Sequence, residues 1–160
     1  MQFIEGIDDG DAKTRSLFNL EKRLVFDPLV YEQRYMKTVD ILAHKKFGKK
    51  IKRILEFGSA ELKFFLYLKN GLQHATRIDL VDIDEDLMNR FHSRVDPLIM
   101  DHISQRGDKF KVNVWKGDVA ISNPNFKDVD AVVAIELIEH VYPDVLEEVP
   151  YHIFGIVKPK

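Results

Sequence analysis

The stretch Asp130-Ala131-Val132-Val133-Ala134-Ile135 runs directly into Glu136-Leu137-Ile138-Glu139-His140. Residues 131–135 are apolar without alternation, which is typical of a strand that is covered on both faces inside a parallel sheet. Polar side chains that directly follow such a strand lie at the carboxyl edge of the sheet, where open α/β sheets bind ligands. The stretch therefore indicates an α/β fold with a functional edge.

Strands and helices alternate upstream of this stretch. We expect four strands, at residues 54–58, 77–83, 110–115 and 130–135. We expect helices at about 27–48, at 60–70 and from 84 to about 105 with a break or kink at Pro97. Two further helical segments are opened by Pro143 and Pro150, before a turn at 158–160. This order predicts an open, doubly wound parallel sheet whose ligand site lies where the strand order reverses.

Length and composition narrow the class of protein. The 160 residues suffice for one domain with a core, and the net charge of −2, from 24 basic and 26 acidic residues, gives no general attraction to nucleic acid. The absence of cysteine excludes disulfides and thiolate chemistry. No apolar segment is long enough for a membrane span and no signal core follows Met1, so we expect a protein of the cytoplasm, including perinuclear granules, or of the nucleus.

Three positions at the expected strand ends suggest a nucleoside site. Gly58 ends the first strand, where a turn without a side chain lets a ligand approach the backbone, although a lone glycine is also ordinary in turns. Asp82 ends the second strand and can accept both hydroxyls of a ribose. The alternative role, an acid at the N-terminus of the next helix, is better served by Asp84, Glu85 and Asp86. Asp118, after the third strand, suits an adenine amino group and a tight turn equally well. A G-x-G-x-x-G fingerprint is absent, which argues against a nicotinamide dehydrogenase.

The cluster after the fourth strand is the more specific signal. Glu136, Glu139 and His140 stand at i, i+3 and i+4, a spacing that places them on one face if the chain becomes helical there. Two carboxylates and one imidazole suit Mg²⁺ or Mn²⁺ rather than a soft metal. The alternative is a solvated helix start with acids near its N-terminus.

A basic run between residues 45 and 53 is open to two interpretations. It contains six basic side chains that contact RNA phosphates on one view and form a solvated cationic helix end on the other. In the preceding helix, Arg34 is the side chain least expected to be purely structural. The run comprises Lys45, Lys46, Lys49, Lys50, Lys52 and Arg53.

At these residues the chain resembles the small-RNA 2′-O-methyltransferases, which use S-adenosylmethionine to methylate the 3′-terminal ribose of piRNAs, siRNAs and plant microRNAs. The resemblance covers about residues 26–159, so we expect an N-terminal arm at 1–25 and a class I, Rossmann-like methyltransferase domain at 26–160. The segments that carry it are Phe26-Asp27-Pro28-Leu29-Val30-Tyr31-Glu32-Gln33-Arg34-Tyr35, Leu55-Glu56-Phe57-Gly58, Val81-Asp82-Ile83-Asp84-Glu85-Asp86 and Ile135-Glu136-Leu137-Ile138-Glu139-His140.

The resemblance implies a role for each candidate residue. Glu56 and Gly58 would line the methionine side of the cofactor, and Asp82 would hold its ribose. Glu136, Glu139 and His140 would supply three of four ligands to a Mg²⁺ or Mn²⁺ ion that grips the terminal ribose hydroxyls and activates the 2′ oxygen. The implied partners are the 3′ end of a small RNA and an Argonaute or Piwi effector protein, and we expect a monomer.

Two departures from the family pattern qualify these expectations. Ala60 stands where the family has a second glycine, and the chain ends before the family's later strands and its fourth ligand, a histidine. We therefore expect a family member without its last third, with the fourth strand as an exposed apolar edge, poor metal binding and weak or no activity. The rival hypotheses are an inactive module that binds the cofactor or a partner, and a methyltransferase for small molecules.

Overall fold

The computed structural model describes residues 27–47, 50–103 and 109–160, in two compact units, Met1–Gln33 and Arg34–Lys160. In the first unit, the Leu29 N–H donates to the Glu32 carboxylate (3.1 Å) and the Gln33 amide donates to the Pro28 carbonyl (2.7 Å). These bonds cap the start of helix α2 (Val30–Leu42), which begins two residues after Pro28 and not at the proline itself. The expected arm at residues 1–25 lies outside the described residues.

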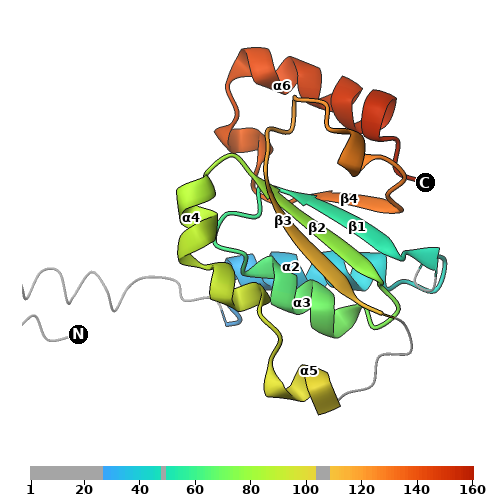
Figure 1. The fold of residues 1–160 in the computed structure, drawn as a ribbon. Coiled ribbons are helices and arrows are strands. Elements are labelled where there is room, and N and C mark those ends of the chain that lie inside the picture. Colours follow the sequence, from blue (N-terminus) through green and yellow to red (C-terminus); the bar gives the residue numbers. More distant parts are fainter. Residues whose placement is uncertain (1–26, 48–49, 104–108) are drawn as a thin grey trace, which may run out of the picture. The chain divides into compact units, whose positions relative to one another are not determined.

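The second unit is built on a sheet of four parallel strands (Figure 1). They are β1 (Arg53–Phe57), β2 (Arg77–Asp82), β3 (Lys111–Lys116) and β4 (Ala131–Ala134), in the order β3-β2-β1-β4. The strand order reverses between β1 and β4, which confirms the expected doubly wound topology and places the switch point between these two strands. Strand β4 forms an edge of the described sheet, as expected, although its apolar sequence without alternation is typical of a strand inside a parallel sheet.

Two cores lie on opposite faces of the sheet because successive side chains of a strand point to opposite sides. Ile54 and Leu80 pack into the core that contains α3 (Phe64–Gly71). Leu55 and Val81 pack into the core that contains Val149 of α6 (Pro143–Pro150). Figure 1 shows α3 and α6 on the two faces, so the sheet is the middle layer of three.

The helices agree with the sequence expectation at Pro97 and differ from it elsewhere. The long helix expected from residue 84, with a break or kink at Pro97, is broken into α4 (Glu85–Arg90), a 3₁₀ turn at His92–Val95 and α5 (Ile99–Ile103). Helix α3 begins at Phe64 instead of residue 60, because Ala60 and Leu62 adopt positive φ and cannot continue a helix. Pro150 ends α6 and is followed without a break by a π-helix at Tyr151–Val157, so it does not open a separate segment.

None of the helices within the described ranges is long and apolar enough to cross a membrane.

A buried carboxylate joins the three strands β1, β2 and β3. The Asp79 side chain is fully buried and accepts hydrogen bonds from Arg53 (3.1 Å), Arg77 (2.9 Å), Asn113 and Trp115 (3.0 Å). Burial acts to raise the pKa of Asp79, but the hydrogen bonds from Arg77, Trp115 and Asn113 outweigh it and hold the pKa below its ordinary value. Arg53, from the basic run, is thus part of the fold.

Candidate functional site

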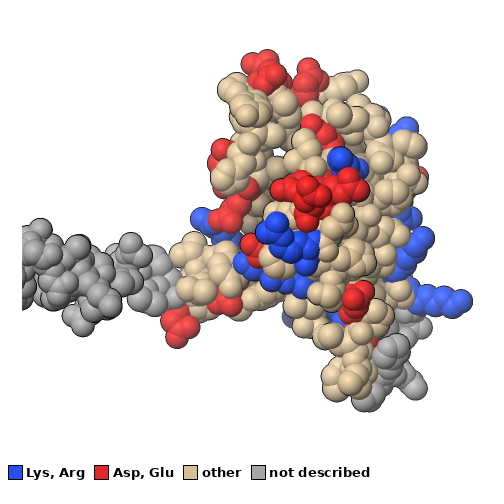
Figure 2. Space-filling view, turned by 60° about the vertical axis from the view of Figure 1, so that its left-hand side comes forward, with Lys and Arg blue, Asp and Glu red and all other residues tan. Residues whose placement is uncertain are grey.

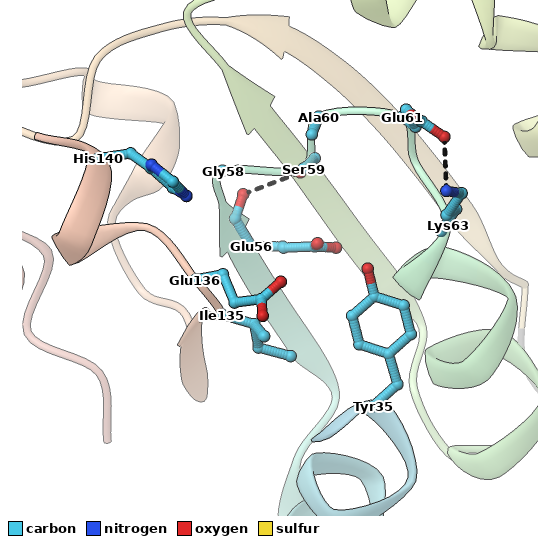
Figure 3. Close-up of a pocket in the computed structure, with 10 residues that line it drawn as sticks. All are labelled: Tyr35, Glu56, Gly58, Ser59, Ala60, Glu61, Lys63, Ile135, Glu136 and His140. Atoms are coloured by element: carbon cyan, nitrogen blue, oxygen red, sulfur yellow. Dashed lines mark hydrogen bonds and ion pairs between the residues drawn. The ribbon is translucent and has the colours of Figure 1, made fainter. Parts of the chain in front are cut away.

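Two adjoining cavities open at the carboxyl edge of the sheet, beside the switch point. One, of about 250 Å³, is lined mostly by polar and charged side chains and is shown in Figure 3; we call it the polar cavity. The other, of about 340 Å³, is lined mostly by apolar side chains; we call it the apolar cavity. They share Gly58, Ala60, Glu136 and His140. The cavities lie at the edge of the sheet where the topology predicts a ligand site.

The turn after β1 separates the two cavities. Gly58 has a φ of 77°, a conformation that L side chains rarely adopt, and a Cβ at this position would lie 3.1 Å from the Leu137 Cδ1 atom. The glycine therefore serves both the turn and the close packing against the segment after β4. Ala60, where the family pattern has glycine, takes a φ of 42° in the same turn.

Two side chains fix this turn to the end of β2. The Ser59 hydroxyl accepts from the Val81 N–H (3.0 Å), and the Ser59 N–H donates to the Val81 carbonyl (3.1 Å). The Asp82 carboxylate accepts from the Ala60 N–H (2.7 Å) and from the Asp84 N–H (2.9 Å). The turn is therefore held by hydrogen bonds at both of its ends.

Asp82 lines the apolar cavity as predicted for a ribose-binding residue, but its oxygens also have backbone partners. Asp82 therefore has a structural role beside the ligand role predicted for it. Asp84 caps α4 as expected, accepting from the Leu87 N–H at 2.9 Å. A carboxylate has about four acceptor positions, so Asp82 retains capacity for ligand hydroxyls.

Glu56, from β1, points into the polar cavity (Figure 3) and is only 4% exposed. None of the described residues donates a hydrogen bond to its Oε2 atom. Burial, with a smaller contribution from the charge of Asp82, raises the pKa of Glu56 to about 8. A buried carboxyl without a partner is costly, so this group is positioned for a cationic or hydrogen-bonding ligand.

Asp118 has the turn role that the sequence left open, and its role toward an adenine stays a prediction. Its carboxylate accepts from the Ala120 N–H at 2.8 Å, which makes it a turn aspartate. It also lines the apolar cavity, together with Val119.

The segment after β4 departs from the expected geometry. Glu136 has a φ of 53°, and the chain coils only at Ile138–His140, in a single 3₁₀ turn closed by the His140 N–H on the Leu137 carbonyl (3.0 Å). The single helical face that was expected for Glu136, Glu139 and His140 is therefore not formed. Glu136 and His140 line both cavities, whereas Glu139 lines neither of them.

The donor types of this segment suit Mg²⁺ or Mn²⁺, but their placement does not. Over the described ranges, no group of three or more His, Asp or Glu side chains is placed to hold a metal ion. The Glu136 carboxylate instead forms an ion pair with the Arg34 guanidinium of α2. As arranged here, these residues do not form a metal centre.

Several residues that line the polar cavity were not among the predicted site residues: Tyr35, Ser59, Ala60, Glu61, Lys63 and Ile135. Tyr35 comes from α2 and packs on Phe64 with ring centroids 5.0 Å apart, and Glu61 and Lys63 form an ion pair of 2.8 Å. Tyr35 lay in the segment that carried the family resemblance, which was the available signal. Lys63 had no such signal, because the sequence placed it inside a helix.

The basic run divides into parts with different roles. Backbone N–H groups of Lys52 and Arg53 donate to the Asp130 carboxylate (2.9 and 2.8 Å), which ties β1 to the start of β4. Lys45, Lys46 and Lys50 line a separate cavity of about 570 Å³ with Phe47 and His74. That these lysines contact RNA stays a prediction. Lys49 lies outside the described residues.

The carboxyl edge also carries charge of both signs. Figure 2 brings forward the side of the molecule on which the strands end, and it shows acidic side chains lying next to basic ones. The residues described above account for such neighbours: Glu136 with Arg34, Glu61 with Lys63, and Glu85 with Lys116 at 3.0 Å.

Solved structures define the class to which this fold belongs. The chain is similar to the crystal structure of the small RNA methyltransferase HEN1, with a TM-score of 0.69 and 17% identity over 87% of this chain and 17% of that one. It is also similar to the methyltransferase domain of a bacterial Hen1, with a TM-score of 0.60 and 20% identity over 81% of this chain and 62% of that chain. The fold is that of the class I S-adenosylmethionine-dependent methyltransferases.

Sequence relatives identify the family within this class. The chain is 46% identical to the small RNA 2′-O-methyltransferase of Drosophila melanogaster over 140 residues, 88% of this chain and 36% of the relative. It is 27% identical to that of Bombyx mori over 154 residues, 95% of this chain and again 36% of the relative. No family model matches the chain. The chain belongs to the small RNA 2′-O-methyltransferases and spans about a third of the length of these curated relatives.

Proposed function

We propose that this chain binds S-adenosylmethionine in the two adjoining cavities and transfers its methyl group to the 2′-hydroxyl of the 3′-terminal nucleotide of a small RNA. The observation that carries the proposal is the pair of cavities at the switch point, one apolar and one polar, divided by the Gly58 turn. A nucleoside joined to an amino acid has the same division, since its purine is flat and largely apolar and its amino-acid end is charged.

The apolar cavity is suited to the adenosine part of the cofactor. Val81 and Val119 provide apolar contact for a purine, and Asp118 lies beside them to accept from its amino group. Asp82 borders the same cavity and can accept from ribose hydroxyls while it holds the Ala60 amide.

The methyl transfer needs a nucleophile and a proton acceptor. The 2′ oxygen forms a bond to the methyl carbon, the carbon–sulfur bond breaks, and the sulfonium becomes a neutral thioether as the hydroxyl proton leaves. His140 lines both cavities and is the candidate base, since a neutral imidazole can accept that proton. Glu136, which lines the same two cavities, would stabilise the imidazolium that forms.

We keep Glu136, Glu139 and His140 as candidate ligands of Mg²⁺ or Mn²⁺ on the chemistry of their donors alone. The present arrangement does not group them, and the Arg34 ion pair engages Glu136, so the transfer above is written without a metal. A cytoplasmic location and a small-RNA effector protein of the Argonaute or Piwi type are further parts of the proposal that rest on the family resemblance.

The test combines cofactor binding with transfer to defined RNA ends. The chain is titrated with S-adenosylmethionine in a calorimeter and then incubated with the labelled cofactor and two short RNAs that differ only in a terminal 2′-hydroxyl or 2′-deoxy group. We expect cofactor binding, and slow transfer to the 2′-hydroxyl end alone. Equal labelling of both RNAs, or no cofactor binding, would contradict the proposal.

A second candidate function is a module that binds the cofactor or a partner without transfer. The observation in its favour is the absence, in the described part of the chain, of a group of three metal-binding side chains. Tight cofactor binding with no transfer to any RNA end would support this function over the enzyme.

A further inference from the structure

The function proposed above leaves the third cavity, of about 570 Å³, without a role. Lys50 and His74 line it, three residues before β1 begins at Arg53 and three residues before β2 begins at Arg77. Because parallel strands begin at the same edge of a sheet, this cavity lies at the amino edge, and we call it the amino-edge cavity. It is therefore separate from the polar and apolar cavities at the carboxyl edge.

Positive charge gathers at the amino-edge cavity. Its described lining contains the three exposed lysines Lys45, Lys46 and Lys50 and no acidic residue. None of these lysines forms an ion pair with a side chain in the described ranges. At the carboxyl edge, by contrast, cations have acidic neighbours, as Lys63 has in Glu61. Three cations around one cavity, without an acid in its described lining, attract an anionic ligand.

An aromatic ring lies among these lysines. Phe47 lines the cavity and is 43% exposed, with the Lys46 Nζ atom 5.4 Å and the His44 ring centroid 6.4 Å from the centroid of its ring. Cations that follow a phosphate backbone, together with rings on which bases stack, are the means by which proteins bind single-stranded nucleic acids of any sequence. An acidic peptide would pair with the lysines alone. The ring therefore favours RNA as the ligand.

Helix α2 connects this cavity to the candidate site. Tyr35, near the start of the helix, lines the polar cavity, and Ala43, directly after its last residue, lines the amino-edge cavity. Arg34, Lys37 and Ile41 are exposed and stand at i, i+3 and i+7, so they lie on one face of the helix. Figure 1 shows α2 on the same face of the sheet as α3. An exposed face with two cations thus leads from one cavity to the other.

We propose that the amino-edge cavity binds the phosphate backbone of the small RNA a few nucleotides upstream of the methylated 3′ end, with Phe47 as a surface on which a base stacks. Strand β1 has five residues, so the two edges of the sheet are about 17 Å apart, which is about five nucleotides of a stacked strand. The inference rests on the proposed function, because it assumes that the 3′ end lies at the carboxyl edge. The cavity then responds to the length of the RNA and not to its sequence.

The test measures RNA affinity as a function of RNA length and salt. Fluorescence anisotropy is recorded for labelled single-stranded RNAs of about 3 and about 12 nucleotides, one shorter and one longer than the expected span. We expect the lysine variant, Lys45→Gln/Lys46→Gln/Lys50→Gln, to bind the longer RNA about tenfold more weakly. Its salt slope should fall by about 2, since each phosphate contact on a single strand contributes about 0.7. Its affinity for the shorter RNA should change less than about twofold.

Two further variants separate stacking from bulk charge. Phe47→Ala should weaken binding of the longer RNA about fivefold or more and leave the salt slope unchanged, because stacking releases no counterions. The control variant, Lys127→Gln/Lys158→Gln/Lys160→Gln, removes the same charge from exposed lysines whose segments adjoin the core on the other face of the sheet, and it should change neither RNA affinity. S-adenosylhomocysteine should bind all three variants as it binds the wild-type chain.

Three results would overturn the inference alone: an unchanged affinity of the lysine variant for the longer RNA, an equal loss in the control variant, or equal losses for the two RNA lengths. Displacement of the longer RNA by a polyglutamate peptide, with no effect of Phe47→Ala, would overturn it in favour of an acidic protein segment. If the lysine variant shows the expected losses but the wild-type chain binds no S-adenosylhomocysteine, the proposed function is refuted and the RNA-binding cavity stands.

Discussion

The turn after β1 and the segment after β4 line the same two cavities, but they are held in place in different ways. In the turn, the N–H groups of Gly58 and Ser59 donate to the Val81 carbonyl (2.9 and 3.1 Å) and that of Ala60 donates to Asp82. The segment after β4 has one short 3₁₀ turn, and Glu136 in it is held by an ion pair with a partly exposed Arg34. The nucleoside half of the site is thus built into the sheet, whereas the half that would act on RNA is not.

The largest effect is expected inside the sheet, at the strands that precede and flank the turn. Asp79→Ala leaves Arg53 and Arg77 without their buried carboxylate and should lower the free energy of unfolding by about 3–5 kcal/mol. Glu139→Ala, in the exposed segment, should change it by less than about 0.5 kcal/mol.

Urea denaturation of both variants measures this difference. Asp79→Asn, which keeps the shape and one acceptor oxygen, provides a milder version should the alanine variant not fold. Similar stabilities for the Asp79 and Glu139 variants would mean that the two regions do not differ in the way described.

Cofactor affinity should also depend on the turn after β1 more than on the segment after β4. Asp82→Ala removes the acceptor of the Ala60 amide together with the expected ribose contact, so S-adenosylhomocysteine should bind about tenfold more weakly or worse. Asp82→Asn, which retains one acceptor oxygen, should lose less, and Glu139→Ala should lose nothing. Calorimetric titration measures the affinity of all three variants. A loss of affinity in Glu139→Ala as large as in Asp82→Ala would show that the two regions do not differ in cofactor binding.

The pH dependence of stability tests the raised pKa of the buried Glu56 carboxyl. The pKa of Glu56 in the folded chain is about 8, above its ordinary value of 4.5. Between these two pH values the folded chain therefore binds more protons than the unfolded chain. The contribution of Glu56 to the free energy of unfolding then falls as the pH rises from 4.5 to about 8. Glu56→Gln should therefore raise the melting temperature more at about pH 8 than at about pH 5.

The pKa of Asp79 is shifted in the opposite direction from that of Glu56, so the two carboxyl groups affect stability at different pH values. Because the folded pKa of Asp79 is lowered, its stabilisation is present above its ordinary pKa and is lost only as pH falls below that value. A Glu56→Gln variant whose melting temperature changes by the same amount at both pH values would show that Glu56 is ionised in the folded chain.

The smallest effect is expected for divalent metal. Since Glu136, Glu139 and His140 are not grouped, Mn²⁺ should shift the melting temperature of the chain by no more than about 1 °C, the response expected of a protein with no tight site. Thermal denaturation with and without Mn²⁺ checks this. A larger rise that His140→Ala abolishes would show that the segment after β4 forms a metal site on its own.

The sequence predicted the sheet well because strand signals are local. Apolar runs ending in Gly58, Asp82 and Glu136 were sufficient to place β1, β2 and β4, and the alternation with helices predicted their parallel order. The same signals could not show that Asp82 holds the Ala60 amide, since that bond joins residues 22 positions apart. Nor could spacing alone place Glu136, because its positive φ, which removes it from a helix, is uncommon for a non-glycine residue and is not encoded in an i, i+3, i+4 pattern.

Hydrogen exchange of the ligand-free chain tests most directly the claim that the nucleoside half of the site is preformed. The hydrogen-bonded amides of residues 58–60 and 62 should exchange slowly, and those of residues 136–139 should exchange quickly. S-adenosylhomocysteine should then protect the first segment further and the second only slightly. Fast exchange in residues 58–62 that slows only when the ligand is added would contradict the account, because the turn would then be formed by the ligand and not by the sheet.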